Sequence, residues 1–390
     1  MILNYGAKNF FCFKEGAEVS FEFPAKCPES ITGGFPVSPV ICVNGTNASG
    51  KTNLLKIITF IGYFIQESFD DKEDTPIPFV SFFNNKEPSS FYLEYNIGGV
   101  VYSYELECTR TAVVSEKLTK AGKIVFDRKK DQIVKYAGEL RKYKDVTLKS
   151  NSSVICTLVN GHRVELLKPV YQYWECGISN LHWSGYRNAN ELKHIENSFI
   201  YHEDKSFAFF TTQLLAKVDP SIKKFELVER TNAKGEKFYL PVFIHKLENN
   251  REAKLDFDLQ SNGTKILYNE CIRILHTLAL GGCLIFDELD ANLHPDIISL
   301  ILELFTNKEN NKKGAQIIFT SHNSEVLNML SKYQLYIVEK ENSESYAYRA
   351  DEIEENVIRN DRSIRTYYEK NMLGGRPKID QSVQLPLKIS

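Results

Sequence analysis

An eight-residue segment, Gly45-Thr46-Asn47-Ala48-Ser49-Gly50-Lys51-Thr52, limits what this chain can fold into more than any other feature. It fits the pattern G-x-x-x-x-G-K-[ST], whose glycines permit a tight loop with inward-pointing backbone N–H groups that cradle an anion. Apolar residues 40–43 predict a buried strand before it. Apolar residues recurring between Leu54 and Ile65 predict an amphipathic helix after it. This order predicts a phosphate-binding loop in an α/β protein.

Each residue type in this loop predicts a task in nucleotide binding. Lys51 would extend to the β- and γ-phosphates, and the Thr52 hydroxyl would bind Mg²⁺. We therefore expect ATP and Mg²⁺ as ligands, held by Gly45, Asn47, Ser49, Gly50, Lys51, Thr52 and Asn53. The alternative interpretation is a glycine-rich turn between a strand and a helix that binds no ligand.

A second motif is an apolar strand that ends in two carboxylates, Cys283-Leu284-Ile285-Phe286-Asp287-Glu288. Asp287 is predicted to complete the Mg²⁺ shell, directly or through water. Glu288 is predicted to orient or deprotonate the water that attacks the terminal phosphate. Adjacent strand residues point in opposite directions, but the chain turns at the end of the strand, so both carboxylates can reach one site. The alternative is a solvent-exposed acidic loop.

Three further segments carry groups that could serve a nucleotide site. Ser261-Asn262-Gly263-Thr264-Lys265 opens a predicted helix over 264–280, and Gly263 lets a phosphate approach the backbone. Asp290 follows the acidic strand. His322 follows apolar residues 316–319, and at such a strand end an imidazole can contact a γ-phosphate. Each segment also has a structural interpretation, as a helix cap, a helix-starting loop and a structural histidine respectively.

Composition excludes some classes of protein and leaves others open. The 390 residues are 43% apolar, with a net charge of −2, so nothing in the overall charge demands a nucleic-acid or membrane partner. No apolar run approaches the roughly 20 residues that span a bilayer. The eight cysteines form no C-x-x-C pair, which disfavours a zinc site and fits a reducing compartment. We expect a cytoplasmic protein without a membrane partner.

Strand and helix patterns predict an α/β fold with a mostly parallel sheet covered by helices. The two ends of the chain carry that sheet, and the middle is an insertion. We divide the chain into an N-terminal lobe with the phosphate loop (1–124), a helical and β insertion (125–250), a C-terminal lobe (251–345) and a tail (346–390). The part after Pro377 is expected to be loose.

These motifs, in this order, resemble those of ABC-type ATPases of the RecF and SMC kind. More narrowly, the chain resembles stand-alone bacterial "AAA domain" ATPases, including those of abortive-infection and other phage-defence systems. The resemblance rests on Asn9-Phe10 in the first strand, residues 45–53, 261–265 and 286–295, and Thr320-Ser321-His322, with a late Gly374-Gly375-Arg376-Pro377.

The resemblance implies a P-loop ATPase head in which a mixed or parallel sheet is flanked by helices, with a β-rich N-terminal subdomain and a mostly helical insertion. It further implies that two heads sandwich two ATP molecules. Lys51, Glu288 and His322 would then perform catalysis, while Ser261, Gly263 and Asp290 act across the seam from the other subunit. It also implies an ATP-dependent homo-oligomer that controls a separate effector, such as a nuclease or toxin, in antiphage defence.

The sequence departs from the ABC pattern in places and leaves rival functions open. The signature segment reads S-N-G-T-K where S-G-G-Q is commoner, and the metal-sensing glutamine has no clear counterpart; residues 82–85 are where we look for it. A RecF-like DNA-binding ATPase of repair or recombination, and an ATP-bound scaffold with little turnover, are the rivals. A basic stretch with interspersed acidic residues fits nucleic-acid binding or a solvated face: Lys117, Lys120, Lys123, Arg128, Lys129, Lys130, Lys135, Arg141, Lys142, Lys144 and Lys149.

Overall fold

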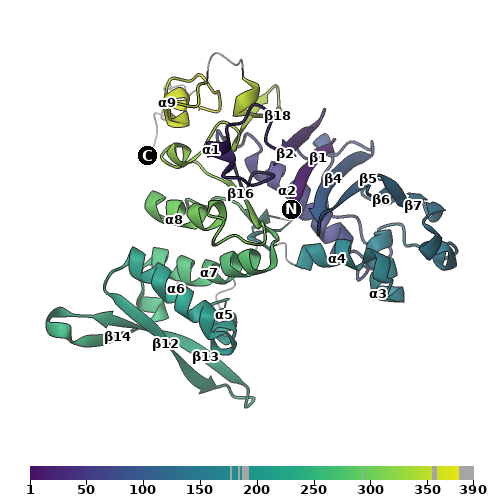
Figure 1. Ribbon diagram of the computed structural model, residues 1–390. Coiled ribbons are helices and arrows are strands. Elements are labelled where there is room, and N and C mark those ends of the chain that lie inside the picture. Colours follow the sequence, from purple (N-terminus) through teal and green to yellow (C-terminus); the bar gives the residue numbers. More distant parts are fainter. Residues whose placement is uncertain (176–177, 183–184, 187–192, 292, 354–357, 377–390) are drawn as a thin grey trace, which may run out of the picture.

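The computed structural model describes residues 1–390 except 176–177, 183–184, 187–192, 292, 354–357 and 377–390 (Figure 1). The strands are β1 (Ile2–Lys8), β2 (Ala17–Ser20), β3 (Val40–Gly45), β4 (Ser89–Ile97), β5 (Val100–Cys108), β6 (Val113–Lys120), β7 (Lys123–Lys129), β8 (Gln132–Tyr136), β9 (Ile178–Ser179), β10 (Leu181–His182), β11 (Gly185–Tyr186), β12 (Ile222–Thr231), β13 (Lys237–Lys246), β14 (Glu252–Asp256), β15 (Cys283–Phe286), β16 (Gln316–Thr320), β17 (Leu335–Glu341) and β18 (Glu344–Arg349). The α-helices are α1 (Glu29–Thr32), α2 (Lys51–Gln66), α3 (Val154–His162), α4 (Lys168–Glu175), α5 (Lys193–Glu203), α6 (Lys205–Val218), α7 (Asn262–Leu280), α8 (Pro295–Thr306) and α9 (Ile364–Glu369).

The nucleotide motifs lie on a six-stranded sheet with the order β18-β17-β3-β16-β15-β9. Neighbouring strands from β17 to β9 pair in parallel, and β18 is antiparallel to β17. β3, β15 and β16 are buried along their whole length, as expected for parallel strands covered on both faces. Because carboxyl ends of parallel strands meet at one edge, Gly45, Asp287 and Thr320 end up close together.

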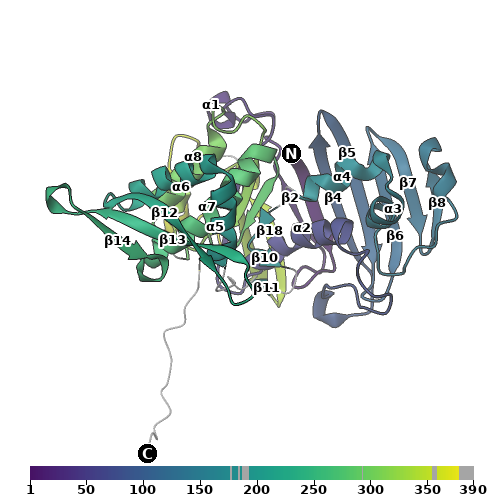
Figure 2. The same cartoon turned by 90° about the horizontal axis from the view of Figure 1, so that it is seen from below.

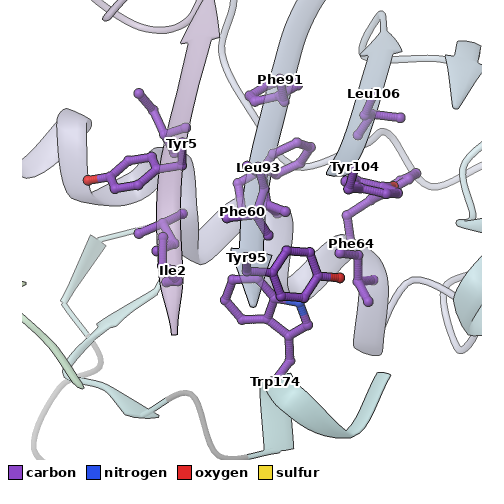
Figure 3. Packing of buried hydrophobic residues seen from close by; sticks show 14 of the residues in the cluster. Ile2, Tyr5, Phe60, Phe64, Phe91, Leu93, Tyr95, Tyr104, Leu106 and Trp174 are labelled. Carbon is purple, nitrogen blue, oxygen red and sulfur yellow. The ribbon is translucent and has the colours of Figure 1, made fainter. Parts of the chain in front are cut away.

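The N-terminal lobe adds a seven-stranded antiparallel sheet with the order β2-β1-β4-β5-β6-β7-β8. Helix α2 lies between this sheet and the parallel one, and one apolar core joins them (Figure 2). Figure 3 shows Phe60 and Phe64 of α2 beside Phe91, Leu93 and Tyr104 of the antiparallel sheet. The apolar side chains of α2 are therefore buried between the two sheets. This packing holds the first turn of α2, where the phosphate loop ends, in place.

A second core fills the other face of the parallel sheet. Helices α7 and α8 pack there, and α5 and α6 lie between α7 and a three-stranded arm with the order β12-β13-β14 (Figure 1). Phe225 and Phe243 of the arm pack against Tyr268 of α7 with ring centroids 5.1 and 5.8 Å away. The arm is thus anchored to the helix that the Ser261 segment opens.

Some expectations need correction. Asn9 and Phe10 lie after the first strand, because β1 ends at Lys8 and Asn9 takes a positive φ of 57°. The predicted boundary after residue 124 falls inside β7, which pairs with β6 and continues the N-terminal sheet; the division into four parts otherwise stays a prediction. The loose tail expected after Pro377 lies outside the described residues. Within those residues, no helix is long and apolar enough to cross a membrane.

Candidate functional site

Two glycines shape the phosphate loop between β3 and α2. Gly45 has a φ of +156°, and a Cβ there would lie 2.2 Å from the carbonyl oxygen of Val338. Gly50, the N-cap of α2, has a φ of +112°, and a Cβ there would lie 2.6 Å from the Cys12 sulfur. Any side chain would therefore collide with its surroundings and strain the backbone. The spacing of these glycines follows from the geometry of the loop.

Lys51 is folded back over the loop that it would serve. Its Nζ donates to the carbonyl oxygens of Gly45 and Thr46 at 2.9 and 2.8 Å. Burial lowers the pKa of the Lys51 ammonium, and the carboxylates of Asp287, Glu288 and Asp290 act in the opposite direction. An anion placed in the loop would favour the charged form of this ammonium, which fits a phosphate ligand.

The Ser49 hydroxyl is a further sign that the loop is built for a ligand. Its oxygen is buried and, among the residues that the structure describes, has no hydrogen-bond partner. Buried polar groups without a partner are uncommon in folded proteins and need an explanation. A phosphate oxygen in the loop would be an acceptor for this hydroxyl.

The Thr52 hydroxyl and the Asp287 carboxylate meet at the start of α2. Thr52 Oγ1 donates to Asp287 Oδ2 at 2.9 Å, and Thr320 Oγ1 donates to Asp287 Oδ1 at 2.6 Å. Hydroxyl and carboxylate oxygens are hard ligands of the type that Mg²⁺ prefers. The pair therefore fits the predicted metal, and the carboxylate is held in place from a second strand.

Glu288 is set by a turn directly after β15. Its φ of +52° takes the chain out of the strand at that residue, and its N–H donates to Thr320 Oγ1 at 2.7 Å. The Glu288 carboxylate lies 4.0 Å from His322 Nε2, and both side chains remain partly exposed, at 43% and 39%. Asp287 and Glu288 thus reach one site although they are adjacent, as the strand-end argument predicts.

Asp290 holds the backbone at the end of β16. Its Oδ2 accepts hydrogen bonds from the N–H groups of His322 and Asn323 at 3.0 and 2.8 Å. In this chain Asp290 therefore positions the histidine. Its predicted action across a subunit seam stays a prediction.

These groups surround one open pocket of about 790 Å³. Nine of the predicted residues line it: Asn47, Gly50, Lys51, Thr52, Asn53, Asp287, Glu288, Asp290 and His322. Cys12, Ala48, Ala291, Thr320 and Lys340 line it as well. Gly45 and Ser49 belong to the same loop but do not line the pocket. Ser261 and Gly263 do not line this pocket.

The Ser261 segment lies at the start of α7. Ser261 is the N-cap of that helix, and its Oγ accepts from the Thr264 N–H at 3.2 Å. Ser261 is exposed, and Leu259 just before it is 68% exposed. Ser261 therefore caps α7, as the helix-cap interpretation predicts. Because the segment is exposed, it can also contact another molecule.

Sequence reasoning missed several contributors to the site. Asn180 follows β9, donates from Nδ2 to the Asp287 carbonyl at 2.9 Å and accepts from the Asp287 N–H at 2.8 Å. No motif marks it, because its position depends on β9 pairing with β15. Thr320 could have been predicted, because it lies two residues before His322 at the end of the same strand. Residues 82–85, where we looked for a metal-sensing group, do not line the pocket within the described part of the chain.

The basic stretch does not form one cationic surface. Lys117 pairs with Glu105 at 3.1 Å across β6 and β5. Arg128 is fully buried and pairs with the buried Glu116 at 3.3 Å. Lys149 donates to the carbonyl oxygens of Phe69 and Asp71 at 2.8 and 2.9 Å. At least three of its cations therefore stabilise the N-terminal lobe.

Comparison with known families supports the same conclusion. Residues 40–328 match a family described as "AAA domain, putative AbiEii toxin, Type IV TA system". The chain belongs to this family. The match begins at β3 and extends past His322, so it includes every predicted site residue. No protein with a curated description matches the sequence.

Two solved structures with a similar fold are head domains of SMC proteins. The SmcHead bound to the C-winged helix domain of ScpA has a TM-score of 0.52 and 12% identity, over 89% of this chain and 97% of that one. The SMC head domain from Thermotoga maritima has a TM-score of 0.44 and 16% identity, over 89% and 98%. The SmcHead structure confirms the predicted α/β fold with a sheet flanked by helices, and the family match confirms the resemblance to the "AAA domain" group with its abortive-infection members.

Proposed function

We propose that this protein is an ATP-hydrolysing switch that closes as a head-to-head dimer on two ATP molecules and controls a partner effector. One observation carries the proposal. The pocket is lined by the predicted cation, metal-binding pair and catalytic carboxylate, yet Ser261 and Gly263 do not line it and lie at the start of α7. A second copy, related by two-fold symmetry, would bring its own Ser261 segment to this pocket and receive the same in return.

Each residue of the pocket has a task in this proposal. Lys51 would exchange its two carbonyl partners for phosphate oxygens, which are better partners for an ammonium. Mg²⁺, bound by Thr52 and Asp287, would neutralise phosphate charge. Glu288, whose backbone Thr320 holds, would take a proton from water. His322, whose Nε2 lies 4.0 Å from the Glu288 carboxylate, would contact the terminal phosphate. Hydrolysis would remove that phosphate and open the dimer.

The effector is the less constrained part of the proposal. The family description names a toxin of a type IV toxin–antitoxin system, and the SmcHead structure holds a separate winged-helix partner. The SmcHead structure supports a head that binds another protein, and the family description supports a place in a toxin–antitoxin system. We infer a cytoplasmic ATPase that restrains or releases a nuclease or toxin in antiphage defence.

A single preparation tests assembly and partner together. The Glu288→Gln protein, expressed from its native operon, is purified with ATP and Mg²⁺ and weighed by native mass spectrometry. The proposal expects at least two copies with nucleotide bound and a second protein attached. Lys51→Ala, prepared in the same way, is the control and should remain unassembled. A Glu288→Gln monomer that ignores ATP would refute the dimer. A dimer that binds DNA and no second protein would contradict the effector role and favour a DNA-repair ATPase.

A further inference from the structure

Lys340 lines the nucleotide pocket, although the proposed function gives it no task. It lies near the end of β17, which pairs in parallel with β3 so that Val338 is opposite Gly45. Lys340 is two residues further along, so β17 extends past the last residue of β3 and runs beside the phosphate loop. The pocket therefore has a second lysine besides Lys51.

The alternation of side chains along β17 directs Lys340 toward the phosphate loop. Successive side chains of a strand point to opposite faces, so Lys340 and Val338 share one face of the sheet. Val338 is fully buried in the core that includes α2, the helix that follows the phosphate loop. Glu339 points to the other face, where its carboxylate accepts hydrogen bonds from the Gly375 N–H and the Tyr348 hydroxyl at 2.9 and 3.0 Å. Lys340 thus faces the start of α2.

The hairpin of β17 and β18 is held in place beside the loop. Its two turn residues, 342–343, have positive φ values of 49° and 70°, as a tight two-residue connection requires. After the turn, the Ser345 N–H donates to the Cys12 carbonyl oxygen at 2.8 Å, and a Cβ at Gly50 would lie 3.1 Å from the Ser345 hydroxyl oxygen. Because Ser345 is the cross-strand partner of Lys340, these contacts fix the backbone from which Lys340 extends.

The Lys340 ammonium is available to an anion. The side chain is exposed, and among the residues that the structure describes it has no ion-pair partner. The acidic residues around the hairpin turn have other partners: Glu344 accepts from the Glu15 N–H at 3.1 Å. The Glu15 carboxylate in turn lies 3.6 and 3.8 Å from the ammonium groups of Lys8 and Lys14. A phosphate in the pocket would therefore not displace an existing ion pair of Lys340.

The order of the sheet indicates which part of a nucleotide Lys340 can reach. Strands β15 and β16 lie on one side of β3, and β17 lies on the other side. Asp287 and Glu288 follow β15, so the metal and the terminal phosphate that water attacks belong on that side. A nucleotide whose phosphates follow the loop after β3 then has its nucleoside end on the side of β17. The phosphate closest to Lys340 is the α-phosphate.

We propose that Lys340 is a nucleotide-binding residue that contacts the α-phosphate. Its three N–H donors form a charge-assisted hydrogen bond there, the kind of bond that is stronger than one between neutral groups. The inference rests on nucleotide binding in the proposed function, and it requires neither the dimer nor an effector. Because ATP and ADP both carry an α-phosphate, Lys340 stabilises the two bound nucleotides equally.

Calorimetric titration of the protein with ADP and with ATP tests this assignment. Lys340→Met keeps an unbranched side chain and removes the charge, so it should weaken both nucleotides by the same factor, about tenfold. Lys340→Arg keeps the charge and should stay within about threefold of the wild type. Lys123→Met is the matched control, because Lys123 is exposed on β7 and does not line the pocket, and it should bind both nucleotides normally.

Steady-state kinetics separate this role from catalysis. In Lys340→Met the KM for ATP should rise while kcat does not fall, because the contact is the same before and after the terminal phosphate leaves. A wild type that binds ADP with the help of Lys340, yet neither dimerises nor hydrolyses ATP, would support this inference and refute the proposed switch. Weaker binding of ATP alone would place Lys340 at the terminal phosphate, and unchanged binding of both nucleotides would exclude a contact. Either of these results would overturn the inference.

Discussion

Replacing Thr320 with valine tests how the catalytic end of the pocket is held together. Thr320 is fully buried, and its hydroxyl makes two bonds, to Asp287 Oδ1 at 2.6 Å and from the Glu288 N–H at 2.7 Å. Valine has nearly the same shape and keeps the strand preference, so the change removes only these bonds. One lost bond involves a carboxylate and the other leaves a backbone N–H unpaired. We expect the free energy of unfolding to fall by about 3 kcal/mol.

The turnover of the folded Thr320→Val protein should fall as well, by more than a smaller folded fraction would explain. Glu288 has a positive φ of 52° at the turn after β15, and the Thr320 bond anchors its backbone there. A misplacement of about 1 Å at a catalytic group can cost roughly 10²-fold in rate. Urea unfolding and steady-state phosphate release measure the two effects. Thr320→Ser, which keeps the hydroxyl, is the control and should lose about 1 kcal/mol and little activity. A Thr320→Val protein with wild-type stability and turnover would refute this reasoning.

Three further predictions concern other parts of the molecule. Gly45→Ala should weaken ATP binding at least tenfold in calorimetry, because the new Cβ would lie 2.2 Å from a carbonyl oxygen. Gly138→Ala is the control and should bind ATP normally, because its Cβ would meet nothing within 4 Å. Equal ATP affinities of the two variants would contradict this prediction. Cys12 lines the pocket, so ATP should slow its alkylation severalfold by peptide mass spectrometry, and unchanged labelling would place the nucleotide elsewhere. Arg128→Met should cost about 3–5 kcal/mol in urea unfolding by leaving Glu116 buried without its cation, and a loss under about 1 kcal/mol would contradict that.

The sequence contained enough information to predict the pocket, for a physical reason. Gly45, Gly50, Asp287 and Glu288 are placed by local rules: a loop that needs positive φ, and strands whose carboxyl ends meet at one edge of a parallel sheet. These rules act over a few residues or over one sheet. They can therefore be read without knowing how the rest of the chain packs.

The missed features depend on long-range packing. Asn180 contacts Asp287 only because the two-residue strand β9 pairs beside β15, and such a short strand leaves little pattern. Arg128 looked like one cation of a surface stretch, yet it is buried against Glu116 through the pairing of β6 and β7. In both cases a neighbour distant in sequence or across a strand pair decides the role of the residue.

If two chains share each nucleotide site, two inactive variants should restore activity when they are mixed. Lys51→Ala removes the phosphate-binding cation, and Ser261→Arg blocks the segment predicted to act across the seam. Each variant alone should be inactive. In an equal mixture, about half of the dimers are mixed, and each mixed dimer has one intact site of two. The mixture should therefore regain about a quarter of wild-type turnover. A mixture as inactive as its components would contradict the shared site, as would a Ser261→Arg protein that is fully active by itself.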